Sequence, residues 1–88
     1  MKLGVFTTKE ELVNWYTNEI EAIRNNGLKL AREMYEAALK GEGKESWMKF
    51  NNTTDEAVWI HHLRWLKNQV KYHERKIKKY EREIAKNS

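Results

Sequence analysis

The three histidines are the residues of this chain best suited to hold a metal ion or carry a proton. His61 and His62 are adjacent, and His73 lies further along the chain. Adjacent helical residues point about 100° apart, and no histidine or acidic residue lies four positions from either member of the pair. Cysteine is absent, so there are no thiolate ligands. We therefore predict no metal site and no cofactor, and expect structural or surface roles for the pair, with a histidine-mediated partner contact as the alternative.

The other polar residues do not assemble a catalytic set. Ser46 and Ser88 are the only serines, and no thiol nucleophile exists. The segment 41–44, Gly-Glu-Gly-Lys, is too short for a phosphate-binding loop and lacks the strand–loop–helix setting that such loops need. Lys29 and Glu33 lie at helical spacing, as is typical of surface ion pairs. The sequence therefore predicts a protein that is not an enzyme.

The net charge of +4 is concentrated at the C-terminal end of the chain. Residues 71–88 hold seven basic and three acidic side chains, whereas residues 1–70 hold ten of each. Six cations share the outer face of the expected last helix: Lys71, Arg75, Lys78, Lys79, Arg82 and Lys86. This strip is typical of a solvated face near a helix C-terminus. The alternative is a binding site for nucleic acid, a nucleotide or another phosphorylated ligand, or an acidic protein, although Glu74, Glu81 and Glu83 interrupt the strip.

Aromatic residues are more numerous than a small two-helix core can hide. The chain contains four tryptophans and four tyrosines, residue types that dominate the energetics of protein interfaces. Two candidate partner-binding patches follow from their spacing: Trp65 with Tyr72 and Arg64, and Trp15 with Tyr35. The alternative is that these rings fill the core and the interface between copies of the chain.

Hydrophobic spacing predicts two long helices in a single domain of residues 1–88. Residues 1–7 are expected to form an N-terminal arm, and the first helix is expected over 8–40. Its apolar stripe recurs in steps of three and four, at Leu12, Tyr16, Ile20, Ile23, Gly27, Leu30, Met34 and Ala38. Asn25-Asn26-Gly27 reads locally as a stop signal, but the stripe keeps its phase through Gly27, which favours one continuous helix over a break. A short helix is expected over 44–50.

The last helix, over 54–86, carries a heptad stripe along its whole length. Thr53 and Glu56 have the spacing of a capping box at its start. The stripe consists of Trp59, Leu63, Leu66, Val70, His73, Ile77, Tyr80 and Ile84, in alternating steps of four and three. We expect it to form an oligomer seam. A polar residue on such a seam usually specifies register or partner, so this role is expected for His73, with a pH-sensitive contact as the alternative.

These elements predict an all-α fold, an antiparallel helical hairpin joined by a short connecting helix. Two helices alone leave much apolar surface exposed, so we expect the hairpin to form a homo-oligomer, as a dimer or higher assembly in a helical bundle. The N-terminus has no apolar run of signal-peptide length, and no stretch approaches the roughly 20 apolar residues of a membrane span. We therefore expect a cytoplasmic protein that does not enter a membrane.

The composition also suggests a class of function. The chain is rich in lysine, asparagine and glutamate and free of cysteine and proline, and in this it resembles small proteins of phages and mobile elements from AT-rich bacterial hosts. The resemblance implies a non-catalytic inhibitor or adaptor that binds a host or defence-system protein in the host cytoplasm. The alternative is a binder of nucleic acid or a phosphorylated ligand through the basic strip. A third interpretation is a small-molecule pocket between subunits.

Overall fold

The computed structural model describes residues 8–87, and within this range every regular element is a helix. In chain order they are α1 (Lys9–Ala22), a π-helical segment η1 (Ile23–Leu28), α2 (Lys29–Leu39), α3 (Lys44–Phe50) and α4 (Glu56–Lys86). The all-α class is therefore confirmed. The expected arm over residues 1–7 lies outside the described residues.

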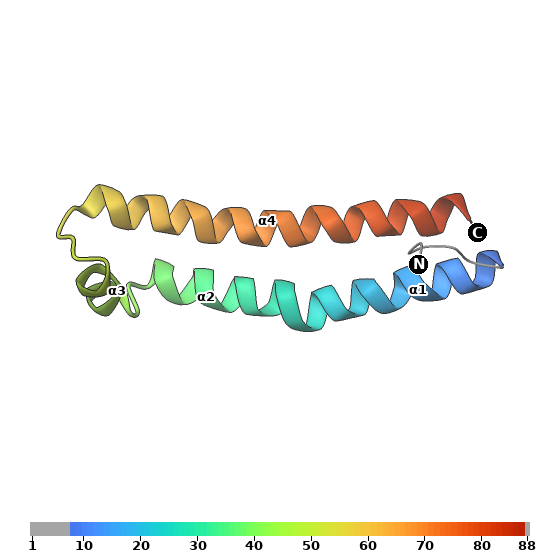
Figure 1. Ribbon diagram of the computed structural model, residues 1–88, viewed down its shortest axis with the longest axis horizontal. Helices are drawn as coiled ribbons and strands as arrows, with labels where there is room; N and C mark the ends of the chain where they lie inside the picture. Colours follow the sequence, from blue (N-terminus) through green and yellow to red (C-terminus); the bar gives the residue numbers. More distant parts are fainter. Residues whose placement is uncertain (1–7, 88) are drawn as a thin grey trace.

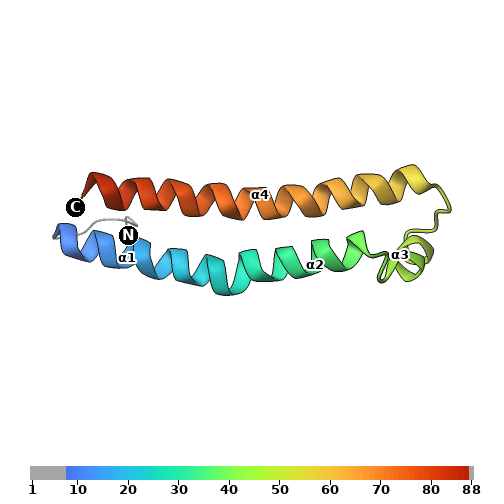
Figure 2. The same ribbon diagram turned by 180° about the vertical axis from the view of Figure 1, so that it is seen from behind.

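α1, η1 and α2 form one uninterrupted rod, called here the first rod. α4 runs back along it in the opposite direction, with the C-terminal end of α4 beside the start of α1 (Figure 1). α3 caps the other end, where the chain turns from α2 to α4, and the view from behind shows the same arrangement (Figure 2). The molecule measures 55 × 27 × 17 Å. The two rods thus form a thin layer in which each has a side not covered by the other.

Local hydrogen bonds explain where the helices begin and end. The hydroxyl of Thr8 accepts a bond from the Glu11 amide at 3.1 Å and caps α1. After α2 the chain turns through Gly41 and Gly43, both with positive φ, a conformation that costs glycine little. α4 starts at Glu56, with Asp55 as its cap accepting from the Ala57 amide at 2.9 Å. The expected Thr53 cap is therefore wrong.

The π-helical segment resolves the question posed by Asn25-Asn26-Gly27. The helix neither breaks nor continues as a regular α-helix, because η1 inserts one extra residue into a turn. Ile23 and Leu28 consequently lie five positions apart yet both pack in the same core cluster. From the last residue of η1 to the end of α2, the buried residues are Leu28, Ala31 and Ala38.

This change of phase corrects the stripe expected for the first rod. Leu30 and Met34 were expected to face the core, but they are 58% and 48% exposed. Leu28 and Ala31 are buried in their place. The regular spacing of three and four residues failed here because one turn of the helix holds an extra residue.

The core consists of two separate apolar clusters. One, near the open end, has Ile20, Leu28 and Ile77 at its centre, with Ile23, Val70, Tyr80 and Ile84 packed around them. The other, near α3, has Ala38, Trp59 and Leu66 at its centre, with Tyr35, Trp47, Met48 and Leu63 around them. The heptad stripe of α4 thus packs within the chain against the first rod. These residues are not free to serve as a seam between copies, so contact with another copy would use a different surface.

Removal of one residue from η1 should be tolerated. Deleting Asn25 returns Ile23 and Leu28 to a spacing of four and joins the two buried stripes in regular α-helical phase. We expect the free energy of unfolding to stay the same or rise by up to about 1 kcal/mol, measured by urea denaturation followed by circular dichroism. Deleting the exposed Lys67 from α4 is the control, because it shifts the whole downstream stripe and should unfold the protein. Equal damage by both deletions would contradict this account of η1.

Candidate functional site

A small hollow opens between the first rod and α4, beside the π-helical segment. Its volume is about 200 Å³. The residues that line it are Gly27, Leu30, Ala31, Met34, Trp65, Leu66, Gln69 and His73. Apart from Gln69 and His73 the lining is apolar, and none of the described residues that line it is an aspartate, glutamate, lysine or arginine, so the hollow suits an apolar group.

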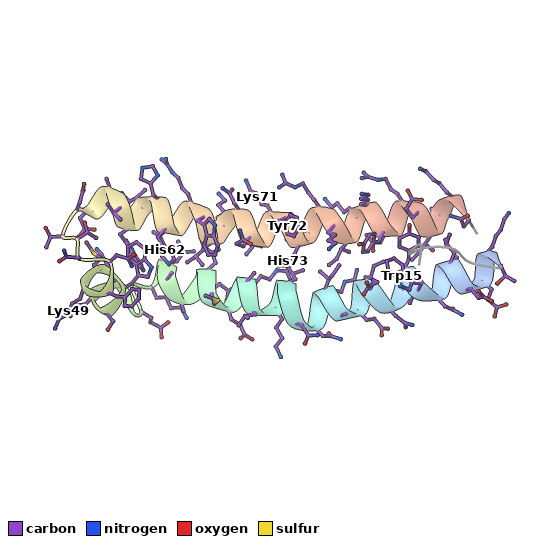
Figure 3. All side chains as sticks on the ribbon, in the orientation of Figure 1. Trp15, Lys49, His62, Lys71, Tyr72 and His73 are labelled. Atoms are coloured by element: carbon purple, nitrogen blue, oxygen red, sulfur yellow. The ribbon has the colours of Figure 1, made fainter. Side chains whose placement is uncertain are left out.

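Gly27 and His73 together set the floor of this hollow. A Cβ atom on Gly27 would lie 2.8 Å from Cε1 and 3.1 Å from Nδ1 of His73. Such distances are too short for ordinary contact, so glycine is what allows the imidazole to lie against the first rod. His73 lies between the two rods in Figure 3. His73, the polar residue of the heptad stripe, therefore makes its contact within the chain, with Gly27.

Large apolar side chains remain exposed at the hollow and beside it, where Leu30, Met34 and Trp65 line the hollow and Tyr72 lies one heptad further along α4. Leu30 and Met34 come from α2, and Trp65 and Tyr72 come from α4, where they are 54% and 50% exposed. Trp65 and Tyr72 are seven residues apart, two helical turns, so both lie on the same side of α4. We call these four residues the groove face. An exposed group of large apolar residues beside a hollow is typical of an interaction site.

The other side of the hairpin carries ion pairs instead. Arg24 bonds to Glu81 at 3.2 Å, and Arg32 bonds to Glu74 at 3.0 Å. Glu74 and Glu81 flank the heptad stripe on the edge opposite to Trp65 and Tyr72. Exposed pairs of this kind contribute little to stability, about 0–1 kcal/mol each. The two sides of the hairpin therefore differ, one apolar and open, the other bridged by charge pairs.

His62 belongs to an aromatic row at the α3 end of the molecule. Its ring stacks on Trp47 with the centroids 4.3 Å apart, and it lies 5.4 Å from Trp59 and 6.1 Å from Trp65. Burial lowers the pKa of His62 below its usual value, which favours the neutral imidazole at pH 7. His61 is exposed. Among residues 8–87 no three histidine or acidic side chains gather where they could hold a metal.

The second aromatic patch expected from the sequence is divided between the two ends of the hairpin. The Trp15 ring lies 5.0 Å from Tyr16 and 6.0 Å from Tyr80, at the open end. Tyr35 packs against the other cluster, beside Ala38 and Trp59. Trp15 and Tyr35 therefore do not form one surface. In the first patch the structure keeps Trp65 and Tyr72 on one side of α4, and Arg64 is exposed next to Trp65.

The basic strip lies on the outer face of α4, as Lys71 illustrates in Figure 3. All six of its cations are exposed. The three acidic residues that interrupt the strip in the sequence are each engaged in ion pairs. Glu74 and Glu81 bond to the first rod, and Glu83 pairs with Lys86 at 3.5 Å. The outer face between residues 64 and 86 is thus more uniformly basic than the sequence indicated.

A larger hollow of about 730 Å³ lies at the α3 end, where Lys49 is seen in Figure 3. Most of its lining residues are of polar or charged type, and Lys44 is already paired with Glu56 at 2.7 Å. Met48 is its one large apolar lining residue. We find no converging set of groups there and regard the groove face as the better candidate.

Sequence reasoning missed Leu30, Met34 and Gln69 as surface residues of a site. The available signal was the step of five between Ile23 and Leu28, which breaks the α-helical spacing and starts a second stripe. None of the described helices is long and apolar enough to cross a bilayer. The chain matches no family model, and neither the curated proteins nor the solved structures gave a significant match.

Proposed function

We propose that this chain is a non-catalytic binding protein that holds an amphipathic helix of a partner protein on its groove face. The observation that carries the proposal is the grouping of Leu30, Met34 and Trp65 around the hollow, with the exposed Tyr72 on the same side of α4. Among residues 8–87, no ion pair bridges the two rods on this side of the hairpin. Helix-in-groove recognition uses apolar anchors at helical spacing, which a groove between two rods accommodates.

The size of the hollow supports a protein partner over a small ligand. Small-molecule sites typically have volumes of about 300–1,000 Å³, whereas this hollow measures about 200 Å³. A cavity of that size suits one large apolar side chain. Trp65 at its rim is the residue type most enriched among interface hot spots. The proposed partner therefore presents an apolar anchor residue to the hollow.

We further propose that the protein is cytoplasmic, forms a homo-oligomer and acts as an inhibitor or adaptor of phage or mobile-element type on a host or defence-system protein. The support for this class is the lysine-, asparagine- and glutamate-rich composition, together with the exposed apolar residues of the groove face. An inhibitor of this kind works by occupying a surface, for which an exposed apolar face is sufficient.

The proposal is tested by affinity purification from a bacterial host lysate with Trp65→Ala as the diagnostic variant. Loss of a hot-spot tryptophan costs about 2 kcal/mol or more in binding, so we expect at least a roughly 30-fold weaker complex. Ile60→Ala is the matched control, because Ile60 is a similarly exposed apolar residue of α4 away from the hollow. Retention of the same partner by wild type and Trp65→Ala at equal affinity would remove the groove face from the proposal.

A second candidate function is binding of nucleic acid or a phosphorylated ligand through the outer face of α4. The observation that favours it is the engagement of Glu74 and Glu81 by arginines of the first rod. Each of the three acidic residues that interrupt the strip thus already has a cationic partner. The outer face of α4 leaves these cations exposed: Lys71, Arg75, Lys78, Lys79 and Arg82. Phosphate contacts from such a row would position a ligand without reading base sequence.

Replacing Lys78, Lys79 and Arg82 together by glutamine tests this second function. If the strip binds nucleic acid, the affinity for a short duplex or single strand should fall at least tenfold at low salt, with a reduced slope of log K against log salt. Fluorescence anisotropy measures both quantities. Lys9→Gln is a control that removes a cation from α1. An unchanged affinity in the triple variant would show that these cations do not bind the ligand.

A further inference from the structure

We infer that, while no partner is bound, the groove face is covered in solution by a second copy of this chain, with α4 of each copy lying on the first rod of the other, so that the second copy and a partner helix compete for this face. This inference rests on the homo-oligomer included in the proposed function and specifies its surface and orientation. The contact between copies is then made by the residues around the hollow and not by the heptad stripe, because that stripe is already packed within the chain.

The first observation is the amount of large apolar surface left on one side of the hairpin. Leu30, Met34, Trp65 and Tyr72 are each about half exposed or more. The core beneath them is thin, because the molecule is only 17 Å across its shortest axis. A second hairpin placed on this side would turn a two-helix layer into a four-helix bundle, the arrangement in which such faces are usually buried.

The second observation is a charge asymmetry between the two rods. The first rod, residues 9–39, holds four basic and six acidic side chains, a net charge of −2. α4 holds nine basic and four acidic side chains, a net charge of +5. An assembly with α4 on α4 would bring like charges together, whereas α4 on the first rod pairs opposite charges. A twofold axis allows two face-to-face dimers, one with α4 on α4 and one with α4 on the first rod. The charges favour the second of these.

The selected dimer has its twofold axis parallel to the rods. Rotation about such an axis exchanges the positions of the two rods but keeps each residue at the same height along them. Leu30, Met34 and Trp65 line the same hollow and so lie at one height. Trp65 of each copy is therefore placed over Leu30 and Met34 of the other, next to the hollow. The contact is self-complementary, as a twofold interface requires.

Light scattering on the purified chain gives the first test. We expect a mass near twice the 10.6 kDa of one chain at micromolar concentration. Trp65→Glu and Met34→Glu each place a charge on the groove face and should both give monomers. Because both positions are about half exposed, helical content measured by circular dichroism should be retained. Ile60→Glu, an exposed apolar position away from the hollow, should leave the dimer intact.

The salt dependence tests the orientation. With α4 on the first rod, raising the salt concentration from 0.05 to about 0.5 M screens favourable pairs and should weaken the dimer severalfold. With α4 on α4, the same change would strengthen it. A monomeric wild type, a dimer that survives both groove-face variants, a dimer lost in Ile60→Glu, or one that tightens with salt would each overturn the inference. A dimer with the expected properties that retains no host protein would leave the inference standing and count against the partner-binding function alone.

Discussion

Replacing Trp59 by alanine is expected to lower the free energy of unfolding by about 3–5 kcal/mol. The side chain is 6% exposed and lies at the centre of the cluster near α3, between Ala38 and Leu66. Its ring contacts Trp47 of α3 with the centroids 5.5 Å apart. Because this one side chain joins α2, α3 and α4, its loss leaves a cavity that none of the three helices can close alone.

This loss is a large fraction of the total free energy of unfolding expected for a chain of this size. An 88-residue protein has a total stability of about 5–15 kcal/mol, so the variant should lose cooperative unfolding or melt far below the wild type. Urea denaturation followed by circular dichroism measures the change. Ile60→Ala serves as control, since Ile60 lies next to Trp59 in the same helix, is 48% exposed and belongs to neither the cluster nor the groove face. Comparable losses from the two variants would show that Trp59 is not the centre of this cluster.

Replacing Ile77 by alanine is expected to lower the free energy of unfolding by about 2–5 kcal/mol. The destabilised part of the molecule should differ from the part destabilised by loss of Trp59. Ile77 is 5% exposed and packs with Ile20 and Leu28 in the cluster at the open end. That cluster shares no residue with the cluster around Trp59. Local opening follows the contacts that are lost, so the damage should concentrate in α1 and the C-terminal half of α4.

Amide hydrogen exchange distinguishes this local effect from global unfolding. In Ile77→Ala, protection should fall most in residues 9–28 and 70–86, and least in α2 and the start of α4. In Trp59→Ala the order should reverse. Ile60→Ala, at an exposed position of α4, should change neither pattern. A uniform loss of protection in Ile77→Ala would indicate that the two clusters unfold as one unit.

The sequence was most informative where apolar residues repeat with a single period. The heptad stripe of α4 spans about seven helical turns, from Trp59 to Ile84 with the polar His73 within it, and Trp59, Leu66 and Ile77 are all buried. What the period could not reveal is the partner of that stripe. An apolar face packs equally well against the same chain or against another copy, because burial has no preference for either.

The second half of the first rod shows the opposite case. Its sequence contains two competing stripes, one through Gly27, Leu30 and Met34 and one through Leu28 and Ala31. Both satisfy helical spacing, so periodicity alone does not decide between them. The packing of α4 determines which stripe is buried. His73 lies against Gly27, while Leu66 and Ile77 fill the neighbouring space. The groove face follows from that choice, so the step of five between Ile23 and Leu28 indicated a second stripe but did not show which stripe is buried.

The two stripes have a consequence for how this rod could respond to its surroundings. If η1 relaxed to a regular α-helix without loss of a residue, α2 would have to rotate by about 100° relative to α1. Leu30 and Met34 would then turn inward while Leu28 and Ala31 turned outward, and the groove face would disappear from the surface. The extra residue between Ile23 and Leu28 thus fixes the rotation of α2 relative to α1. A ligand that binds Met34 in its exposed position would stabilise the π-helical conformation of η1.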